Sequence, residues 1–171
     1  MTTRRTVIKS ASAAIVYRLV GSSPALKAAG PNDQIGFGFI GSGIRGTYLL
    51  EEFMKIPGVR ALIVADLYDG YLEKAKEQTN GAIRTTKRYE EVLEHPEVDA
   101  VVIATPDHWH HRMVLDALRA GKHVYIEKPL TWSIEEGIDL IEATRQSGKL
   151  VQVGSQHKTT ALTAKARELI Q

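Results

Sequence analysis

The sequence has 171 residues, of which 43% are hydrophobic and 25% are charged, a composition typical of one ordinary globular domain. The net charge of +2 is unevenly distributed: residues 1–30 contain five basic residues and no acidic residue, so the remainder carries a net charge of −3. This balance argues against a nucleic-acid-binding surface, which needs a concentration of Lys and Arg. The absence of cysteine excludes disulfides, thiol catalysis and cysteine-ligated metals.

Residues 1–30 are predicted to be an export signal. The pair Arg4-Arg5 precedes a stretch rich in Ser and Ala that is apolar but too short to span a membrane. This arrangement is similar to a bacterial twin-arginine signal and therefore predicts a periplasmic location. A solvated basic tail on a cytoplasmic protein, or an organelle transit peptide, are the alternatives.

From Pro31 onward, apolar runs of strand length alternate with helical patterns, which predicts a parallel sheet with helices on both faces, an α/β fold of the Rossmann type, over residues 31–158. The expected strands are Ile35–Ile40, Val59–Ala65, Ile83–Thr85, Ala100–Ala104, His123–Ile126 and Leu150–Val153. The expected helices are Arg45–Lys55, Tyr71–Gln78, Tyr89–Leu93, His110–Ala120 and Ile134–Ser147. For the last of these, Ser133 and Glu136 form a capping-box pattern, and Gly148 is placed to end the helix, as Gly121 is for the helix before it.

A glycine-rich loop follows the first expected strand directly and opens a helix. Its sequence is Gly41-Ser42-Gly43-Ile44-Arg45-Gly46. In this context Gly41 is expected to form the tight turn, Gly43 to let the backbone approach a pyrophosphate, and Gly46 to let helix and strand pack closely. The loop therefore predicts a dinucleotide-binding site.

The start of the following helix would offer free N–H groups and partial positive charge to the phosphates, so Ile44 and Arg45 are candidate cofactor contacts. Twenty residues after Gly46, the second expected strand ends at Asp66. A carboxylate there can accept hydrogen bonds from the adenosine ribose and would repel a 2′-phosphate, so the expected cofactor is NAD, with NADP less favoured. Arg45 complicates this choice because a guanidinium near the loop could also serve a phosphate.

The loop after the Ala100–Ala104 strand is polar and aromatic, and it lies at the sheet edge where ligands bind in open α/β folds. Thr105 and Pro106 are expected to form a rigid turn under the dinucleotide, and Asp107 to cap the next helix. His110 is a candidate cofactor contact by position. The three nearby histidines lack the spacing and the carboxylate of a ligand set, so no metal site is predicted.

Several motifs in consistent order across Pro31 to Gln171 together resemble the Gfo/Idh/MocA family, the glucose–fructose oxidoreductase and inositol dehydrogenase group. They are the glycine loop, Ala104-Thr105-Pro106 with His110, Ala120-Gly121-Lys122-His123-Val124, Glu127-Lys128-Pro129 and Val153-Gly154-Ser155-Gln156. The resemblance implies a Rossmann domain followed by an open-faced α/β substrate domain. It also implies NAD or NADP as cofactor and redox chemistry on sugars or cyclitols.

The resemblance implies a catalytic role for Lys128 and places Glu127 and Gln156 at the cofactor site. Removing a hydride from a secondary alcohol also requires a base for the hydroxyl proton. We expect a neighbouring cationic nicotinamide and partial burial to make the neutral amine of Lys128 accessible. An ion pair between Lys128 and Glu127 that only fixes the turn is the structural alternative.

The length is about half that of a two-domain dehydrogenase. We therefore expect residues 159–171 to begin a helix that leads to a substrate domain, which this chain lacks. The aspartate and histidine that the family carries in that domain are then also expected to be missing from this chain. The expected function is hydride transfer between NAD and a sugar, cyclitol or related polyol, in a protein that is a homo-oligomer at full length and has no stable membrane span. A redox-neutral glycosidase of the same family and a non-catalytic NAD-binding module are the alternatives.

Overall fold

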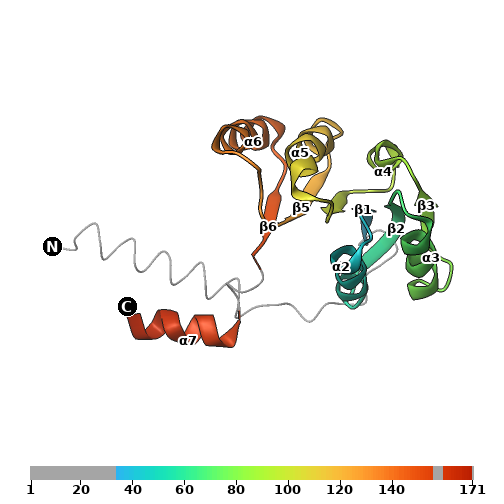
Figure 1. Ribbon diagram of the computed structural model, residues 1–171, viewed down its shortest axis with the longest axis horizontal. Coiled ribbons are helices and arrows are strands. Elements are labelled where there is room, and N and C mark those ends of the chain that lie inside the picture. The colour runs from blue at the N-terminus through green and yellow to red at the C-terminus, as the bar shows by residue number, and fades with distance from the viewer. Residues whose placement is uncertain (1–33, 156–159, 171) are drawn as a thin grey trace. The chain divides into compact units, whose positions relative to one another are not determined.

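The computed structural model describes residues 34–155 and 160–170 (Figure 1). The export signal predicted for residues 1–30 lies outside this range. No helix within the described ranges has both the length and the hydropathy needed to cross a membrane.

Six parallel strands form one sheet in the order β3-β2-β1-β4-β5-β6. The first strand therefore lies in the middle of the sheet. The next two strands are added on one side of it and the last three on the other, which is the Rossmann order. The direction of building reverses between β1 and β4, whose carboxyl ends lie side by side. The strands are β1 (Ile35–Ile40), β2 (Val59–Ala65), β3 (Arg84–Thr86), β4 (Ala100–Ile103), β5 (His123–Glu127) and β6 (Val151–Gly154).

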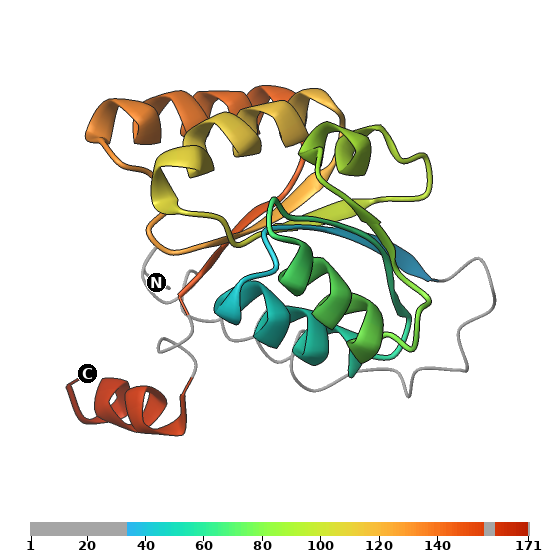
Figure 2. The same ribbon diagram turned by 45° about the vertical axis from the view of Figure 1, so that its right-hand side comes forward.

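Helices cover both faces of this sheet, with α2 and α3 on one face and α4, α5 and α6 on the other (Figure 2). The helices are α2 (Ile44–Met54), α3 (Asp69–Gln78), α4 (Tyr89–Glu94), α5 (His110–Arg119), α6 (Ile134–Ser147) and α7 (Ala161–Ile170), and a short 3₁₀ turn, η2 (Asp107–Trp109), precedes α5. The predicted fold is thus confirmed.

The strands supply two separate cores because successive side chains of a strand point to opposite faces. In β4, Val101 and Ile103 pack into the core beneath α4, α5 and α6, whereas Val102 packs into the core beneath α2 and α3. All four residues of β4 are buried. Burial on both faces explains why this strand reads as a continuous apolar run rather than an alternating one.

Helix α6 has both predicted end signals. The Ser133 hydroxyl accepts a hydrogen bond from the Glu136 backbone N–H, and the Glu136 carboxylate accepts one from the Ser133 backbone N–H. Gly148 ends the helix with a φ of 65°, a left-handed conformation that glycine adopts without a steric penalty. The boundaries predicted for this helix are therefore confirmed.

Several predicted bounds differ from the structure by one or two residues, and three local differences have a physical cause. The strand predicted at Leu150–Val153 runs one residue later, because pairing with β5 begins at Val151 and leaves Leu150 exposed. The strand predicted at Ile83–Thr85 is shifted in the same direction, since Ile83 turns into the core before the ladder begins. Asp107 does not cap α5: it lies inside η2, where its Oδ1 atom accepts a hydrogen bond from the adjacent His108 N–H.

Candidate functional site

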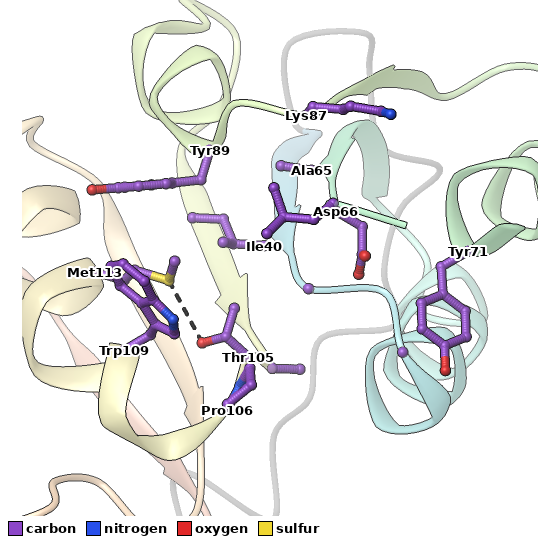
Figure 3. A pocket seen from close by; sticks show the side chains of 14 residues that line it. Ile40, Ala65, Asp66, Tyr71, Lys87, Tyr89, Thr105, Pro106, Trp109 and Met113 are labelled. Atoms are coloured by element: carbon purple, nitrogen blue, oxygen red, sulfur yellow. Dashed lines mark hydrogen bonds between the residues drawn. The ribbon is translucent and has the colours of Figure 1, made fainter. Parts of the chain in front are cut away.

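A cavity of about 510 Å³ opens at the carboxyl ends of β1, β2 and β4, where the building direction of the sheet reverses (Figure 3). This is the position at which open α/β sheets bind their ligands. Its walls come from the loops that follow β1, β2, β3 and β4 and from the starts of α3, α4 and α5. The lining residues are Ile40, Gly41, Gly43, Ala65, Asp66, Leu67, Tyr71, Lys87, Tyr89, Ala104, Thr105, Pro106, Trp109 and Met113.

The glycine loop turns tightly against β4, as its sequence predicts. Gly41 has a φ of +86°, and a Cβ atom there would lie 2.8 Å from the Ala104 carbonyl oxygen. A Cβ atom on Gly46 would lie 2.1 Å from the carbonyl oxygen of Gly41. Both positions therefore require glycine, and α2 starts closer to β1 than any side chain would allow.

The beginning of α2 faces the cavity without a side-chain cap. Gly43 occupies the N-cap position and lines the cavity, and no side chain of residues 34–155 or 160–170 caps the helix there. A Cβ atom on Gly43 would meet only the Tyr71 ring, at 3.7 Å, so here glycine keeps the backbone open to a ligand. The uncapped first turn, which begins at the exposed Ile44, thus suits an anion such as a pyrophosphate.

Asp66 ties the end of β2 to the glycine loop. Its Oδ2 atom accepts hydrogen bonds from the backbone N–H and the hydroxyl of Ser42, at 2.7 and 3.3 Å, and its Oδ1 atom accepts one from the Tyr68 N–H at 2.9 Å. The carboxylate is half-buried and lines the cavity (Figure 3). It is therefore already oriented, and its remaining acceptor capacity fits the hydroxyls of a ribose.

The loop after β4 forms the opposite wall of the cavity. Thr105 and Pro106 both line it, and the Thr105 hydroxyl lies 3.5 Å from the sulfur of Met113 (Figure 3). Trp109, which closes η2, is 47% exposed and contributes an aromatic surface to the same wall. Thr105 and Pro106 thus lie where the sequence predicts, and their contact with a cofactor remains a prediction.

His110 is 1% exposed and does not line the cavity, although it follows this wall directly. Its Nδ1 atom lies 2.6 Å from the carbonyl oxygen of Pro129, and its Nε2 atom lies 3.0 Å from that of Thr105. The ring therefore links the cavity wall to the turn after β5. Both ring nitrogens already face protein carbonyl groups, and the predicted contact of His110 with the cofactor remains a prediction.

The other histidines of this loop do not assemble a metal site. His111 pairs with the Asp139 carboxylate of α6 at 2.7 Å. Across residues 34–155 and 160–170, no three His, Asp or Glu side chains are grouped so as to hold an ion.

Glu127, the last residue of β5, pairs with Arg45 of α2 rather than with Lys128. Its carboxylate is 6% exposed, and its Oε1 atom lies 2.7 Å from both Nε and Nη2 of Arg45. Burial alone would lower the pKa of the Arg45 guanidinium, but hydrogen bonding to Glu127 and its charge outweigh burial and raise it. Burial and the Glu127 charge likewise raise the pKa of Tyr125. Neither Glu127 nor Arg45 lines the cavity, so their predicted cofactor contacts stay predictions.

Lys128 follows Glu127 and precedes Pro129 through a cis peptide bond. Its side chain is exposed, so the partial burial expected for it is not found in this chain. The ion pair with Glu127, the structural alternative to catalysis, is also absent from the described residues, because Arg45 occupies that carboxylate. Gln156, which the family resemblance places at the cofactor site, lies outside the described residues.

Comparison with known proteins decides the family. The oxidoreductase family with an NAD-binding Rossmann fold, Gfo/Idh/MocA, matches residues 35–155. The chain belongs to this family. It carries the NAD-binding domain, with the glycine loop, Asp66 and the Glu127-Lys128-Pro129 turn inside the matched range.

Two curated relatives and one solved structure illustrate the range of the family. The chain is 34% identical over 149 residues to glycosyl hydrolase family 109 protein 2 of Shewanella sp. strain ANA-3, covering 77% of this chain and 32% of that one. It is 32% identical to scyllo-inositol 2-dehydrogenase (NAD(+)) of Bacillus subtilis strain 168, and the match covers 80% of this chain and 40% of that one. It superposes on scyllo-inositol dehydrogenase from Lactobacillus casei, crystallised with NAD(H) and scyllo-inositol, with a TM-score of 0.75, 26% identity and coverage of 80% and 41%. The chain thus spans about a third to two fifths of the length of these proteins.

Proposed function

We propose that the protein, together with a substrate domain, transfers a hydride between NAD and a secondary hydroxyl of a sugar, cyclitol or related polyol. The observation that carries the proposal is the position of Lys128. It stands on the turn whose Pro129 carbonyl is held by His110, and the same ring reaches the Thr105 carbonyl in the cavity wall. The turn that carries Lys128 is therefore anchored beside the proposed cofactor site, while the Lys128 side chain itself is exposed.

Oxidation of a secondary alcohol breaks a C–H bond and an O–H bond. Bound NAD would supply the acceptor for the hydride and would be held by the glycine loop and Asp66. Lys128 would accept the hydroxyl proton, and its exposed side chain has room to approach a substrate from the solvent side. Because Arg45 engages the Glu127 carboxylate, the turn is fixed without an ion pair between Glu127 and Lys128.

A redox-neutral glycosidase is the second candidate, and the similarity to a glycosyl hydrolase family 109 protein favours it. In this reaction NAD would be recycled within each turnover, so the hydride taken from the sugar returns to it. The scyllo-inositol 2-dehydrogenase relative, at nearly the same identity, favours net oxidation. The two candidates share the cofactor site and differ in the final electron balance.

The product of the complete reading frame should be assayed with NAD against scyllo-inositol, other polyols and chromogenic glycosides. Net oxidation predicts one NADH per oxidised substrate, whereas the glycosidase predicts released aglycone without accumulated NADH. Lys128→Ala should lower turnover by about 10²- to 10⁴-fold, the range of general base catalysis, with little change in NAD affinity. Unchanged turnover would remove Lys128 from the mechanism.

For the whole protein we also propose a periplasmic location and a homo-oligomeric assembly. The first follows from Arg4-Arg5, because the twin-arginine receptor reads the two guanidinium groups as an address and not as bulk charge. Replacing both with Lys keeps the charge and should abolish export in a bacterial host. Undiminished periplasmic protein would refute the signal. Size measurement of the full-length protein tests the assembly.

A further inference from the structure

Lys87 is the one cationic side chain among the described residues that line the cavity, and Asp66 also lines it. It directly follows β3, the strand that pairs with β2, so its backbone lies beside the strand end that carries Asp66. Figure 3 shows its side chain extending across the rim above Ala65 and Asp66. A cation at this place would favour a cofactor with an additional phosphate on the adenosine ribose.

The Lys87 ammonium is already engaged by a second carboxylate. Its nitrogen lies 2.9 Å from Oδ1 and 3.0 Å from Oδ2 of Asp69, the first residue of α3. Both oxygens are therefore within hydrogen-bonding distance of the same ammonium group. A further phosphate binding to Lys87 would have to compete with this carboxylate, and would meet its negative charge while doing so.

We propose that Asp69 is a specificity-determining residue, which maintains the preference for NAD over NADP by neutralising Lys87. The inference rests on the adenosine end of NAD lying at Asp66. Asp66 repels a 2′-phosphate directly, whereas Asp69 pairs with Lys87 and so prevents this cation from binding the phosphate. The two carboxylates thus discriminate by different physical means, and the contribution of Asp69 exists only while Lys87 is present.

Calorimetric titration with NAD and NADP at low ionic strength, on the whole chain, tests the proposal. Asp66→Ser serves as the background because it removes the direct repulsion. In that background, Asp69→Asn should raise NADP affinity about two- to fivefold, the range spanned by exposed ion pairs. NAD affinity should not change. With Lys87→Met also present, Asp69→Asn should give at most a small gain.

Glu73→Gln provides the matched control. Glu73 lies on the same helix, is exposed and pairs with its own lysine, Lys76, which does not line the cavity, whereas Lys87 does. Its removal changes the net charge as Asp69→Asn does and should leave NADP affinity unaltered. An equal gain from Glu73→Gln, or a gain from Asp69→Asn that persists without Lys87, would overturn the proposal. Failure of the parent chain to bind NAD would instead refute the cofactor site itself.

Discussion

The Arg45 guanidinium and the Glu127 carboxylate, 82 residues apart in the chain, are joined by a 2.7 Å contact between Nη2 and Oε1. Arg45 lies in the first turn of α2, beside the glycine loop, and Glu127 ends β5, immediately before Lys128. The ion pair therefore connects the proposed pyrophosphate-binding end of the site to the turn that carries the proposed base.

The two partners should not be equally costly to remove. Arg45→Met leaves a carboxylate that is 6% exposed without its cation and should lower the free energy of unfolding by about 2–3 kcal/mol. Glu127→Gln retains an acceptor oxygen and leaves only a half-exposed cation without its carboxylate. It should therefore lower the free energy of unfolding by about 1 kcal/mol. Urea denaturation measures both. Lys55→Met, in an exposed pair with Glu51 and Glu52, should change nothing measurable. A larger cost for Glu127→Gln than for Arg45→Met would contradict this account.

Gly46→Ala should disrupt the start of α2. The added methyl group would lie 2.1 Å from the Gly41 carbonyl oxygen, a backbone atom that cannot rotate away. We expect a loss of about 2–3 kcal/mol of stability from overpacking, together with loss of NAD binding. Thermal unfolding and calorimetry measure the two effects.

Gly137→Ala is the matched control, because Gly137 lies inside α6 and its added Cβ would meet only the Thr131 hydroxyl at 3.7 Å. Helix propensity predicts a gain of up to about 1 kcal/mol there, with NAD binding unchanged. Equal changes in stability and NAD binding from the two substitutions would show that neither property depends on the close packing at Gly46.

Asp66→Ser should narrow the preference for NAD over NADP by removing a like charge from the 2′-phosphate. It should also loosen the glycine loop, because Ser42 loses its carboxylate acceptor, so some affinity for NAD itself should be lost. The ratio of dissociation constants, measured by calorimetry, separates these effects. Asp139→Ser, an exposed carboxylate on α6, should leave the ratio unchanged. Tighter binding of NADP by the parent chain would refute the assignment of Asp66.

Stability should fall in acid partly through Asp116. Burial would raise the pKa of this carboxyl, but hydrogen bonds from Arg112 and Tyr89 outweigh burial and lower it. A carboxyl with a lowered pKa in the folded state stabilises the fold above its unfolded pKa of about 3.9 and loses that contribution as pH falls through the folded pKa. The stability difference between the parent and Asp116→Asn should therefore be constant at neutral pH and shrink below about pH 4.

Tyr89→Phe removes one of those hydrogen bonds while keeping the ring, so its stability deficit should show the same pH dependence with a smaller amplitude. Urea denaturation over a pH series measures all three proteins. A deficit of Asp116→Asn that is independent of pH down to strong acid would contradict the account.

The parts of the fold that the sequence predicts best are those with local signals. The bounds of β1, β2 and α6 follow from apolar runs and from a capping box, all set within a few residues. The glycine loop is predictable for the same reason. Its conformation depends on the strand before it and the helix after it.

The parts that could not be predicted depend on strand order. Lys87 and Tyr89 line the cavity only because β3 pairs with β2 and α4 returns toward β1, and no local pattern encodes that path. The contact between Arg45 and Glu127 likewise requires α2 to lie beside the end of β5. His110 looks like an exposed polar residue at a helix start, but two distant carbonyl groups hold it in the interior.

We expect NAD to bind in the cavity between the glycine loop, Asp66 and Thr105. Calorimetric titration of the purified chain with NAD, on a sample whose fold is verified by circular dichroism, measures this binding. We expect saturable binding at one site, lost in Gly46→Ala and retained in Gly137→Ala. A folded chain that binds no NAD, or binding that is indifferent to Gly46→Ala, would contradict this expectation.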